Sequence, residues 1–221
     1  VTLKDGKVVG YTSLVVAPGL KLDWDGVEGL NDALGQNGVT SNYRYDLAPY
    51  TWELVKKMDG REAIFTQPGM PIKCAGAPQK AMYLSCDHWL KKGQLKDMNV
   101  SFCNAGPVLF GCAPYVPPLM KYVDKYGISL DFGHNLIKID GAKKTAWFKV
   151  TKEGSDSEVL ERKFDMIHVC PPQCAPDFIR DSVLSNDSGW VDVDPATLQH
   201  VNFSNIFSLG DVTSTPNAKT V

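Results

Sequence analysis

The sequence predicts an α/β fold with a parallel sheet. Apolar, strand-like runs alternate with segments of helical periodicity through the middle of the chain. Of the 221 residues, 43% are hydrophobic, which is enough for a packed core. The chain has 23 basic and 25 acidic residues and a formal net charge of -2, so charge gives no reason to expect nucleic acid as a partner.

The first 42 residues are predicted to be the end of one domain and a linker. Residues 7–11 and 13–17 are two short strand-like runs that end at Pro18-Gly19. A turn-rich stretch follows, and residues 48–58 then have the apolar spacing of an amphipathic helix.

Two strand–helix units come next, followed by a meander of strands. The order strand, helix, strand, helix is typical of a parallel α/β unit, and the meander is expected to cover one face of its sheet. The predicted elements in order are strand 63–66, helix 75–92, strand 99–102, helix 117–126 capped by Gly127, strands 135–140, 144–151 and 159–163, and further strands at 166–169 and 205–211.

The cysteines give no sign of a disulfide framework or a metal site. All six lie in a chain too long to need disulfide staples, and their spacing is irregular. The pair Cys170 and Cys174 is separated by three residues, which fits neither a redox C-x-x-C motif nor a zinc knuckle, so both are interpreted as ordinary thiols. The four histidines are scattered, and we therefore expect no metal.

Two further classes are disfavoured. No apolar run is long enough to span a bilayer, and the N-terminus does not resemble a signal peptide. The turn after strand 63–66 carries prolines and side chains where a dinucleotide-binding G-x-G-x-x-G would lie, which argues against NAD binding at that turn. No other segment supplies that glycine motif after a strand.

That turn offers a thiol instead. Cys74 stands next to Lys73 and just before the predicted helix, and both a neighbouring cation and a helix N-terminus can lower a cysteine pKa below about 8.5. The small residues 75–77 leave room for a cofactor ring or a small substrate. The alternative is a buried and inert Cys74, since free cysteine is among the most buried residue types.

The same segment carries a family resemblance. Residues 65–80, which include the string Lys-Cys-Ala-Gly-Ala-Pro-Gln-Lys, closely resemble the cysteine-bearing segment of sulfide:quinone oxidoreductases of the mitochondrial and related bacterial type. The resemblance continues in residues 82–85, 189–194, 197–200 and 205–213, and so covers most of the chain. It implies the Rossmann-like, FAD/NAD(P)-binding two-domain fold of flavoproteins.

The resemblance also implies an activity. In that family noncovalent FAD and a cysteine pair oxidise sulfide through a persulfide and pass the electrons to a membrane quinone. Cys74 matches one of these cysteines, which makes it the implied catalytic residue, with Lys73 as a helper near the thiol. A low-pKa thiolate suits this role because persulfide exchange needs both a nucleophile and a leaving group.

Positions that match the family's FAD contacts lie near both ends of the chain. Asp211 matches the acid that binds the ribityl chain of the flavin, although a strand-ending helix cap would explain it as well. Pro18 departs from the family pattern, which puts a backbone amide contact there in doubt. The implied cofactor-binding residues are Val16, Ala17, Gly19, Asp211, Lys219 and Thr220.

The implied domains are residues 1–42 as the end of an FAD-binding domain and linker, 43–170 as a second Rossmann-like domain, and 171–221 as a return to the first. The glycine fingerprint for FAD, the second redox cysteine and the membrane-contacting helices are expected outside this chain. We therefore expect a soluble segment that alone neither holds FAD stably nor turns over. Its parent would be a peripheral membrane protein of a bacterial or mitochondrial inner membrane.

Two alternatives stay open at this point. The first is a related flavoprotein, such as a flavocytochrome-type sulfide dehydrogenase or an NADH:quinone reductase, although glycines at the turn before Ala77 would have supported the latter. The second is a fragment that keeps the fold without a cofactor, in which Cys74 would be buried and inert.

Overall fold

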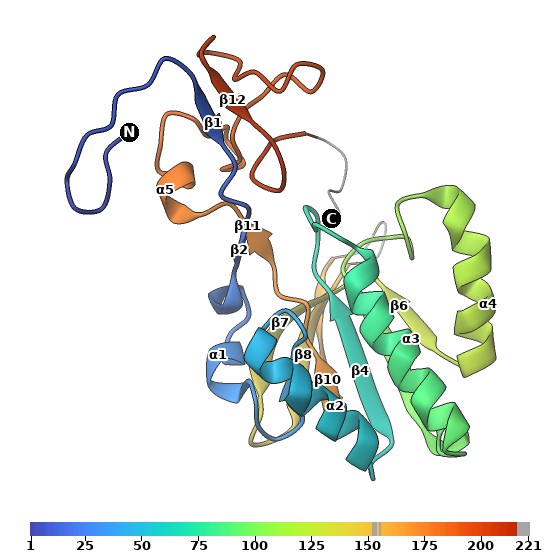
Figure 1. Ribbon diagram of the computed structural model, residues 1–221. Helices are drawn as coiled ribbons and strands as arrows, with labels where there is room; N and C mark the ends of the chain where they lie inside the picture. Colours follow the sequence, from blue (N-terminus) through green and yellow to red (C-terminus); the bar gives the residue numbers. More distant parts are fainter. Residues whose placement is uncertain (152–153, 155, 216–221) are drawn as a thin grey trace. The chain divides into compact units, whose positions relative to one another are not determined.

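The computed structural model describes residues 1–151, 154 and 156–215, and it divides into two compact units (Figure 1). The larger unit runs from Leu22 to Pro172, and the smaller one combines Val1–Lys21 with the chain from Gln173 onward. Each unit has its own apolar core. The assignment of the chain ends to an FAD-binding domain stays a prediction.

A five-stranded sheet forms the centre of the larger unit. Its strand order is β3-β10-β4-β5-β6, and every neighbouring pair is parallel. Apolar residues fill the strands because both faces are covered, as expected of a parallel sheet. The strands are β3 (Val39–Thr40), β10 (Met166–His168), β4 (Glu62–Gln67), β5 (Asn99–Asn104) and β6 (Ser129–Phe132).

Helices cover one face of this sheet. They are α2 (Ala48–Lys57), α3 (Gly76–Lys91) and α4 (Val116–Tyr126), and Figure 1 draws α2 and α3 on either side of β4. Trp89 of α3 is fully buried, and its indole Nε1 donates to the backbone oxygen of Val55 in α2 at 2.9 Å. Gly127 ends α4 in the left-handed conformation, φ 64°, as the sequence predicted.

A three-stranded antiparallel sheet covers the other face. Its strands are β7 (His134–Asp140), β8 (Thr145–Val150) and β9 (Glu158–Lys163), so the predicted meander is confirmed. Phe148 of β8 packs in one core cluster with Ile64 of β4 and Ile167 of β10, together with Leu30 of the short helix α1 (Leu30–Ala33). The central sheet is thus enclosed on both faces.

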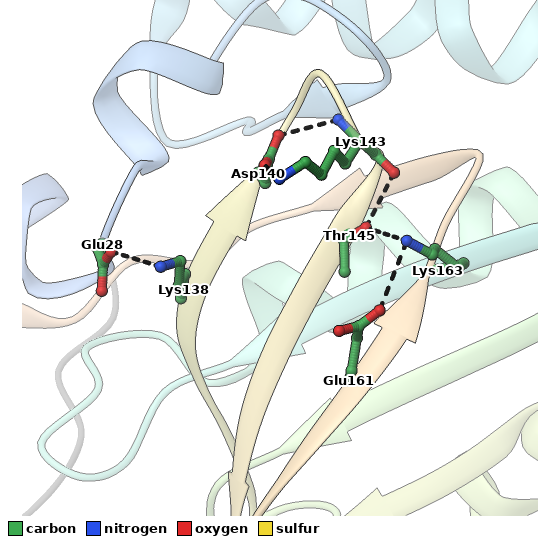
Figure 2. A network of polar contacts seen from close by, with 7 residues as sticks. All are labelled: Glu28, Lys138, Asp140, Lys143, Thr145, Glu161 and Lys163. Atoms are coloured by element: carbon green, nitrogen blue, oxygen red, sulfur yellow. Dashed lines mark hydrogen bonds and ion pairs between the residues drawn. The ribbon is translucent and has the colours of Figure 1, made fainter.

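Polar contacts line the hairpin between β7 and β8 (Figure 2). The turn is closed by Asp140, whose Oδ1 accepts from the backbone N–H of Lys143 at 2.9 Å. Thr145 at the start of β8 accepts from Lys163 Nζ of β9 at 2.6 Å. Glu28 and Lys138 form an ion pair at 2.7 Å. Most of these side chains are well exposed, so each pair contributes little to the free energy of unfolding.

The smaller unit is built on a parallel pair, β1 (Leu14–Val16) and β12 (Ile206–Ser208). Its core contains Trp190 and Val191, which pack with Ile179 of the short helix α5 (Asp177–Arg180). The strand predicted over residues 7–11 is wrong, because Val8 makes only an isolated bridge to Thr2. That segment is exposed, and no strand in the described part of the chain pairs with it.

The remaining elements are short. In the described part of the chain, no helix is long and apolar enough to cross a membrane. The short elements are β2 (Lys21–Leu22), β11 (Gln173–Cys174) and the 3-10 helices Trp24–Gly26, Tyr45–Leu47, Leu95–Asp97 and Ala113–Tyr115.

Candidate functional site

The candidate site lies at the carboxyl ends of three neighbouring strands in the larger unit. Because β3, β10 and β4 are parallel and adjacent, the segments that follow them meet at one edge of the sheet. This edge is where open α/β sheets bind ligands. The three segments carry Tyr43, Cys170 and Cys74 respectively.

Cys74 lies in the loop between β4 and α3 and is only partly buried. Its backbone is in the left-handed region, φ 65°, which is rare for a residue with a side chain and tends to occur where function constrains the chain. The Cys74 carbonyl accepts from Ala77 N–H at 3.0 Å, directly before α3 begins at Gly76. The neighbouring Ile72 and Lys73 are buried, 1% and 7% exposed, so packing fixes this part of the loop. The fully buried Cys74 that an inert fragment requires is not observed.

Cys170 follows β10 and is held between the ends of the two neighbouring strands. Its backbone N–H donates to Thr66 Oγ1 of β4 at 3.2 Å. On the other side, Val169 N–H donates to the Thr40 carbonyl of β3 at 2.8 Å, and Ser41 Oγ donates to the Val169 carbonyl at 2.6 Å. These bonds fix the backbone that carries the thiol, and Cys170 itself is buried, 2% exposed.

The environment of Cys170 keeps its thiol protonated. Burial raises the pKa of Cys170 to about 12, the Tyr43 hydroxyl acts in the opposite direction, and Cys74 adds to the increase. An O–H donor lowers a thiol pKa because it stabilises the thiolate. The three side chains therefore influence one another electrostatically.

The Tyr43 hydroxyl is the least satisfied group of this cluster. It is buried and interacts with the Cys170 thiol, which is only a weak acceptor, so no conventional hydrogen bond to the hydroxyl is formed within the described residues. Burial raises the pKa of Tyr43 above its ordinary value, and the Cys170 and Cys74 thiols raise it further. Tyr43 thus presents an O–H donor beside two sulfur atoms.

His168 supports the same strand ends from within β10. Its side chain is fully buried and stacks on Phe65, with ring centroids 6.0 Å apart. Burial lowers the pKa of His168 to about 4, so the ring is neutral. Nε2 accepts from Asn42 N–H at 2.9 Å, which leaves the proton on Nδ1, and Nδ1 has no partner among the residues described.

The predicted cofactor-binding residues lie in the smaller unit. Val16 is paired with Ser208 at the ends of parallel β1 and β12, and Ser208 Oγ donates to the Val16 carbonyl at 2.6 Å. Ala17 and Gly19 follow β1, and Asp211, which is partly exposed, follows β12. The structure therefore brings these predicted residues to one end of the strand pair. Lys219 and Thr220 lie outside the described residues.

The strand ends of the smaller unit have room for a cofactor. Gly19 and Gly210 have φ of 76° and 77°, and a Cβ added at either would meet no described atom within 4 Å. Open backbone and a carboxylate at the carboxyl ends of parallel strands fit a dinucleotide such as FAD. Within the residues that the structure describes, no group of His, Cys, Asp and Glu could hold a metal ion.

The cluster around Cys74 was not predicted from the sequence. Cys170 was interpreted as an ordinary thiol, and Tyr43 was not considered. Cys170 carried a usable signal, because it follows the apolar run of a predicted strand, whereas Tyr43 follows the two-residue strand β3, which no apolar run marks. Nothing local in the sequence indicated that these strands are neighbours.

Comparison with solved structures defines the class. The chain superposes on the sulfide:quinone oxidoreductase of Aquifex aeolicus with a TM-score of 0.73 and 21% identity, covering 96% of this chain and 49% of that one. A chain in the Tetrahymena thermophila mitochondrial ATP synthase gives a TM-score of 0.79 at 23% identity, covering 97% and 53%. The Plasmodium falciparum NDH2 in complex with NADH gives 0.63 at 12% identity, covering 95% and 46%. At these identities the similarity shows the fold alone, and it confirms the predicted Rossmann-like α/β fold.

Characterised relatives with higher sequence identity show which family the chain resembles. The mitochondrial sulfide:quinone oxidoreductase of Dictyostelium discoideum is 44% identical over 100% of this chain and 48% of its own length. That of Mus musculus is 36% identical over 97% of this chain and 47% of its own length. The resemblance to this family is thus confirmed, and the chain spans about half the length of the relatives it matches. No family model matches the chain.

Proposed function

We propose that this chain is a segment of a flavin-dependent sulfide:quinone oxidoreductase in which Cys74 carries the sulfur. The observation that supports it most is the 44% identity, over the whole chain, to a sulfide:quinone oxidoreductase. The position of Cys74 adds a physical argument, because it is partly exposed at the ligand-binding edge of a parallel sheet.

Cys74 acts as a nucleophile and as a carrier in this proposal. Hydrosulfide attacks the Cys74 sulfur of a disulfide, the disulfide bond breaks, and Cys74 is left as a persulfide while the partner thiol is released. The sulfide sulfur is thereby oxidised by two electrons and the disulfide is reduced. A second thiol acceptor then removes the outer sulfur and restores Cys74. The buried neighbours Ile72 and Lys73 hold the loop that positions this thiol.

FAD is the proposed cofactor, and the smaller unit holds part of it. Gly19 and the neighbouring Val16 and Ala17 offer open backbone at the end of β1, and Asp211 offers a carboxylate that can accept hydrogen bonds from ribityl hydroxyls. Lys219 and Thr220 belong to the same proposed set. When bound, FAD supplies two-electron transfer between the reduced thiols and a quinone.

The proposed partners are sulfide, a sulfur acceptor and a membrane quinone, and the proposed setting is the surface of a mitochondrial inner membrane or a bacterial membrane. The mitochondrial names of the relatives support the first setting. An NADH:quinone reductase is the less favoured reading. The turn before α3 lacks the glycines that let backbone amides approach a pyrophosphate, and it carries the buried side chains of Ile72 and Lys73 there.

Sulfide-dependent quinone reduction by the full-length enzyme tests the proposal. Cys74→Ser is expected to lower kcat by on the order of 10³-fold or more, with flavin absorbance retained, because a hydroxyl cannot form a persulfide. Cys112→Ser is the matched control, since Cys112 is exposed on another loop, and it should keep full activity. Under limiting sulfide, mass spectrometry should find one added sulfur atom on the peptide 72–80. Undiminished turnover by Cys74→Ser would refute the proposal.

A further inference from the structure

A cavity of about 430 Å³ lies between α3, α4 and the loop that joins β5 to α4. Figure 1 shows α3 and α4 beside one another on the larger unit. None of the three side chains clustered around Cys74 lines this cavity, so it is separate from the site described above. Its volume is within the range of pockets that bind small organic molecules.

Four aromatic rings form most of the walls. Tyr83 of α3 and Tyr122 of α4 have ring centroids 6.2 Å apart, and Phe110 and Tyr115 of the loop pack edge to face at 6.3 Å. These pairs hold the rings in place before any ligand binds, which reduces the entropy lost on binding. Exposed aromatic surface around a concavity is favourable to bury, so the cavity suits a planar apolar ring.

A buried amide joins two sides of the cavity. Gln79 lines it from the first turn of α3 and is 3% exposed. Its Nε2 donates to the Leu109 carbonyl of the loop at 2.7 Å, and to the Ala75 carbonyl at 3.4 Å. The Leu109 side chain is itself buried. The loop is therefore anchored to α3, and the cavity is part of the packed fold.

Two polar groups of the lining indicate the charge of a ligand. The Tyr83 hydroxyl is buried and has no hydrogen-bond partner among the described residues. Burial raises the pKa of Tyr83 to about 12, so the hydroxyl is a neutral donor at pH 7. Lys80 is exposed, is the one charged residue among the described residues of the lining, and takes part in none of the ion pairs of the described chain. An unused donor and an uncompensated cation favour a ligand with a negative group.

We propose that this cavity is a binding site for an aromatic carboxylate or sulfonate. The four rings pack against the aromatic part of the ligand, Lys80 pairs with its anionic group, and the Tyr83 hydroxyl donates a hydrogen bond to it. The site goes beyond the proposed function, since neither proposed substrate matches it. Hydrosulfide has no apolar part to fill the cavity, and a neutral quinone leaves Lys80 without a counter-charge.

Fluorescence titration of the 221-residue chain with anilinonaphthalenesulfonate tests the site. Phenylnaphthylamine, which has the same rings without the sulfonate, is the uncharged comparison. The sulfonate should bind about threefold or more tighter than the uncharged probe, because only the sulfonate pairs with Lys80. Lys80→Met should abolish this preference, whereas Lys121→Met should retain it, since Lys121 is an exposed lysine of α4 outside the lining. Equal affinities of the unsubstituted chain for the two probes would overturn the proposal.

Substitutions in the walls locate the bound probe. Tyr83→Phe removes only the hydroxyl and should weaken binding of the sulfonate about fivefold, with Tyr45→Phe, at an exposed tyrosine, as the control. Tyr122→Ser removes one ring and should weaken both probes about tenfold or more. Tyr122 is 49% exposed, and far-UV circular dichroism checks that the variant folds. Phe178→Ser, at a 67% exposed ring of α5, is the matched control and should leave both affinities unchanged.

The full-length enzyme should keep the site. Equilibrium dialysis of the flavoenzyme with anilinonaphthalenesulfonate should give the affinity found for the chain and the same loss in Tyr122→Ser. Binding to the chain and not to the full-length enzyme would overturn the proposal, because the rest of the protein would then cover the cavity. An affinity that Tyr122→Ser leaves unchanged would also overturn it, since the probe would lie elsewhere. These outcomes are independent of sulfide oxidation, which Cys74→Ser tests.

Discussion

Two partly buried polar regions on the central sheet of the larger unit are built in opposite ways. On one side, Arg162 of β9 reaches the parallel sheet, and both terminal nitrogens of its guanidinium donate hydrogen bonds. It donates to Asp131 Oδ2 of β6 at 2.6 Å, to Ser101 Oγ of β5 at 2.8 Å and to Cys103 Sγ at 3.3 Å. Each of these contacts ties the antiparallel sheet to the parallel one.

The strand ends around Cys74 are left incomplete by comparison. The Tyr43 hydroxyl, His168 Nδ1 and Gln67 Oε1 are buried and make no conventional hydrogen bond within the described residues. Each such group costs about 1–3 kcal/mol relative to a satisfied one. Unsatisfied buried polar groups therefore lower the stability of the fold at this edge of the sheet, and not around Arg162.

The two regions differ in whether their buried polar groups have hydrogen-bond partners. Partnered groups stabilise the fold, and unpartnered groups can bind a ligand. A network in which every donor has an acceptor rigidifies a structure and has nothing to offer a ligand. Buried polar atoms whose hydrogen-bonding capacity is not filled, such as His168 Nδ1 and Gln67 Oε1, remain available to a group that binds beside them. Substitutions in the two regions should accordingly have different signatures in stability, pH dependence and thiol reactivity.

The largest expected stability effect is the pH dependence caused by His168. Its pKa is lowered to about 4 in the folded chain, so the unfolded chain binds more protons below the ordinary His pKa of about 6.5. Its contribution is fully present above about pH 6.5 and is lost as the pH falls toward 4, by about 3 kcal/mol in all. The free energy of unfolding is measured by urea titration at about pH 7 and about pH 4.5. It should be lower at the acidic pH in the unsubstituted chain, and this difference should be absent in His168→Gln. His134→Gln should retain the loss, and an equal loss in His168→Gln would contradict the assignment.

The next effect comes from breaking the satisfied network. Arg162→Met leaves Asp131 and Ser101 without their donor and should lower the free energy of unfolding by about 2 kcal/mol, less than for a fully buried pair. The discount follows from exposure, since the two charged side chains are 21% and 28% exposed. Urea titration measures the change. The double variant Arg162→Met/Asp131→Leu should recover part of it, because the orphaned carboxylate is removed; no recovery would mean that packing, and not the charge, dominates.

Local pattern was enough to predict most of the larger unit. The alternation of apolar strands with amphipathic helices predicted the bounds of β4, α3 and α4 to within one or two residues. Hydrophobic periodicity and helix caps such as Gly127 are features of residues close together in the sequence. The failed strand at residues 7–11 has the same local pattern, but among the described elements it makes only the isolated bridge between Thr2 and Val8. Strand formation depends on a partner that a local pattern does not contain.

The candidate site was predictable only in part for the same reason. Cys74 stood out through its neighbours in sequence, Lys73 and the small residues after it. Tyr43 and Cys170 are far from Cys74 in the chain, and only the strand order β3-β10-β4 brings their strand ends together. β10 pairs with both β3 and β4, although it lies far from them in the sequence. Local sequence patterns do not predict such long-range strand pairing.

A smaller change at the incomplete edge should loosen Cys170 without removing it. Thr66→Val deletes the oxygen that accepts the Cys170 N–H at 3.2 Å, leaving a buried donor unpaired at a cost of about 1 kcal/mol. Thr66→Ser keeps the oxygen and is the control. Iodoacetamide should label Cys170 several-fold faster in the valine variant under native conditions, through more frequent local opening. Identical labelling rates in the two variants would show that this bond does not hold the strand end.

The smallest effect on stability is expected for an exposed ion pair whose two segments are already joined by backbone hydrogen bonds. Lys138 and Glu28 lie 2.7 Å apart, but their side chains are 43% and 70% exposed (Figure 2). The backbone already joins the same segments, since Glu28 N–H donates to the Ile137 carbonyl at 2.9 Å and Ile139 N–H to the Glu28 carbonyl at 2.8 Å. Lys138→Met should therefore change the free energy of unfolding by about 0.5 kcal/mol or less, and by still less in 1 M salt. A loss of free energy of unfolding as large as that of Arg162→Met would contradict this expectation. It would mean that solvent exposure does not decide how much a charge pair contributes to stability.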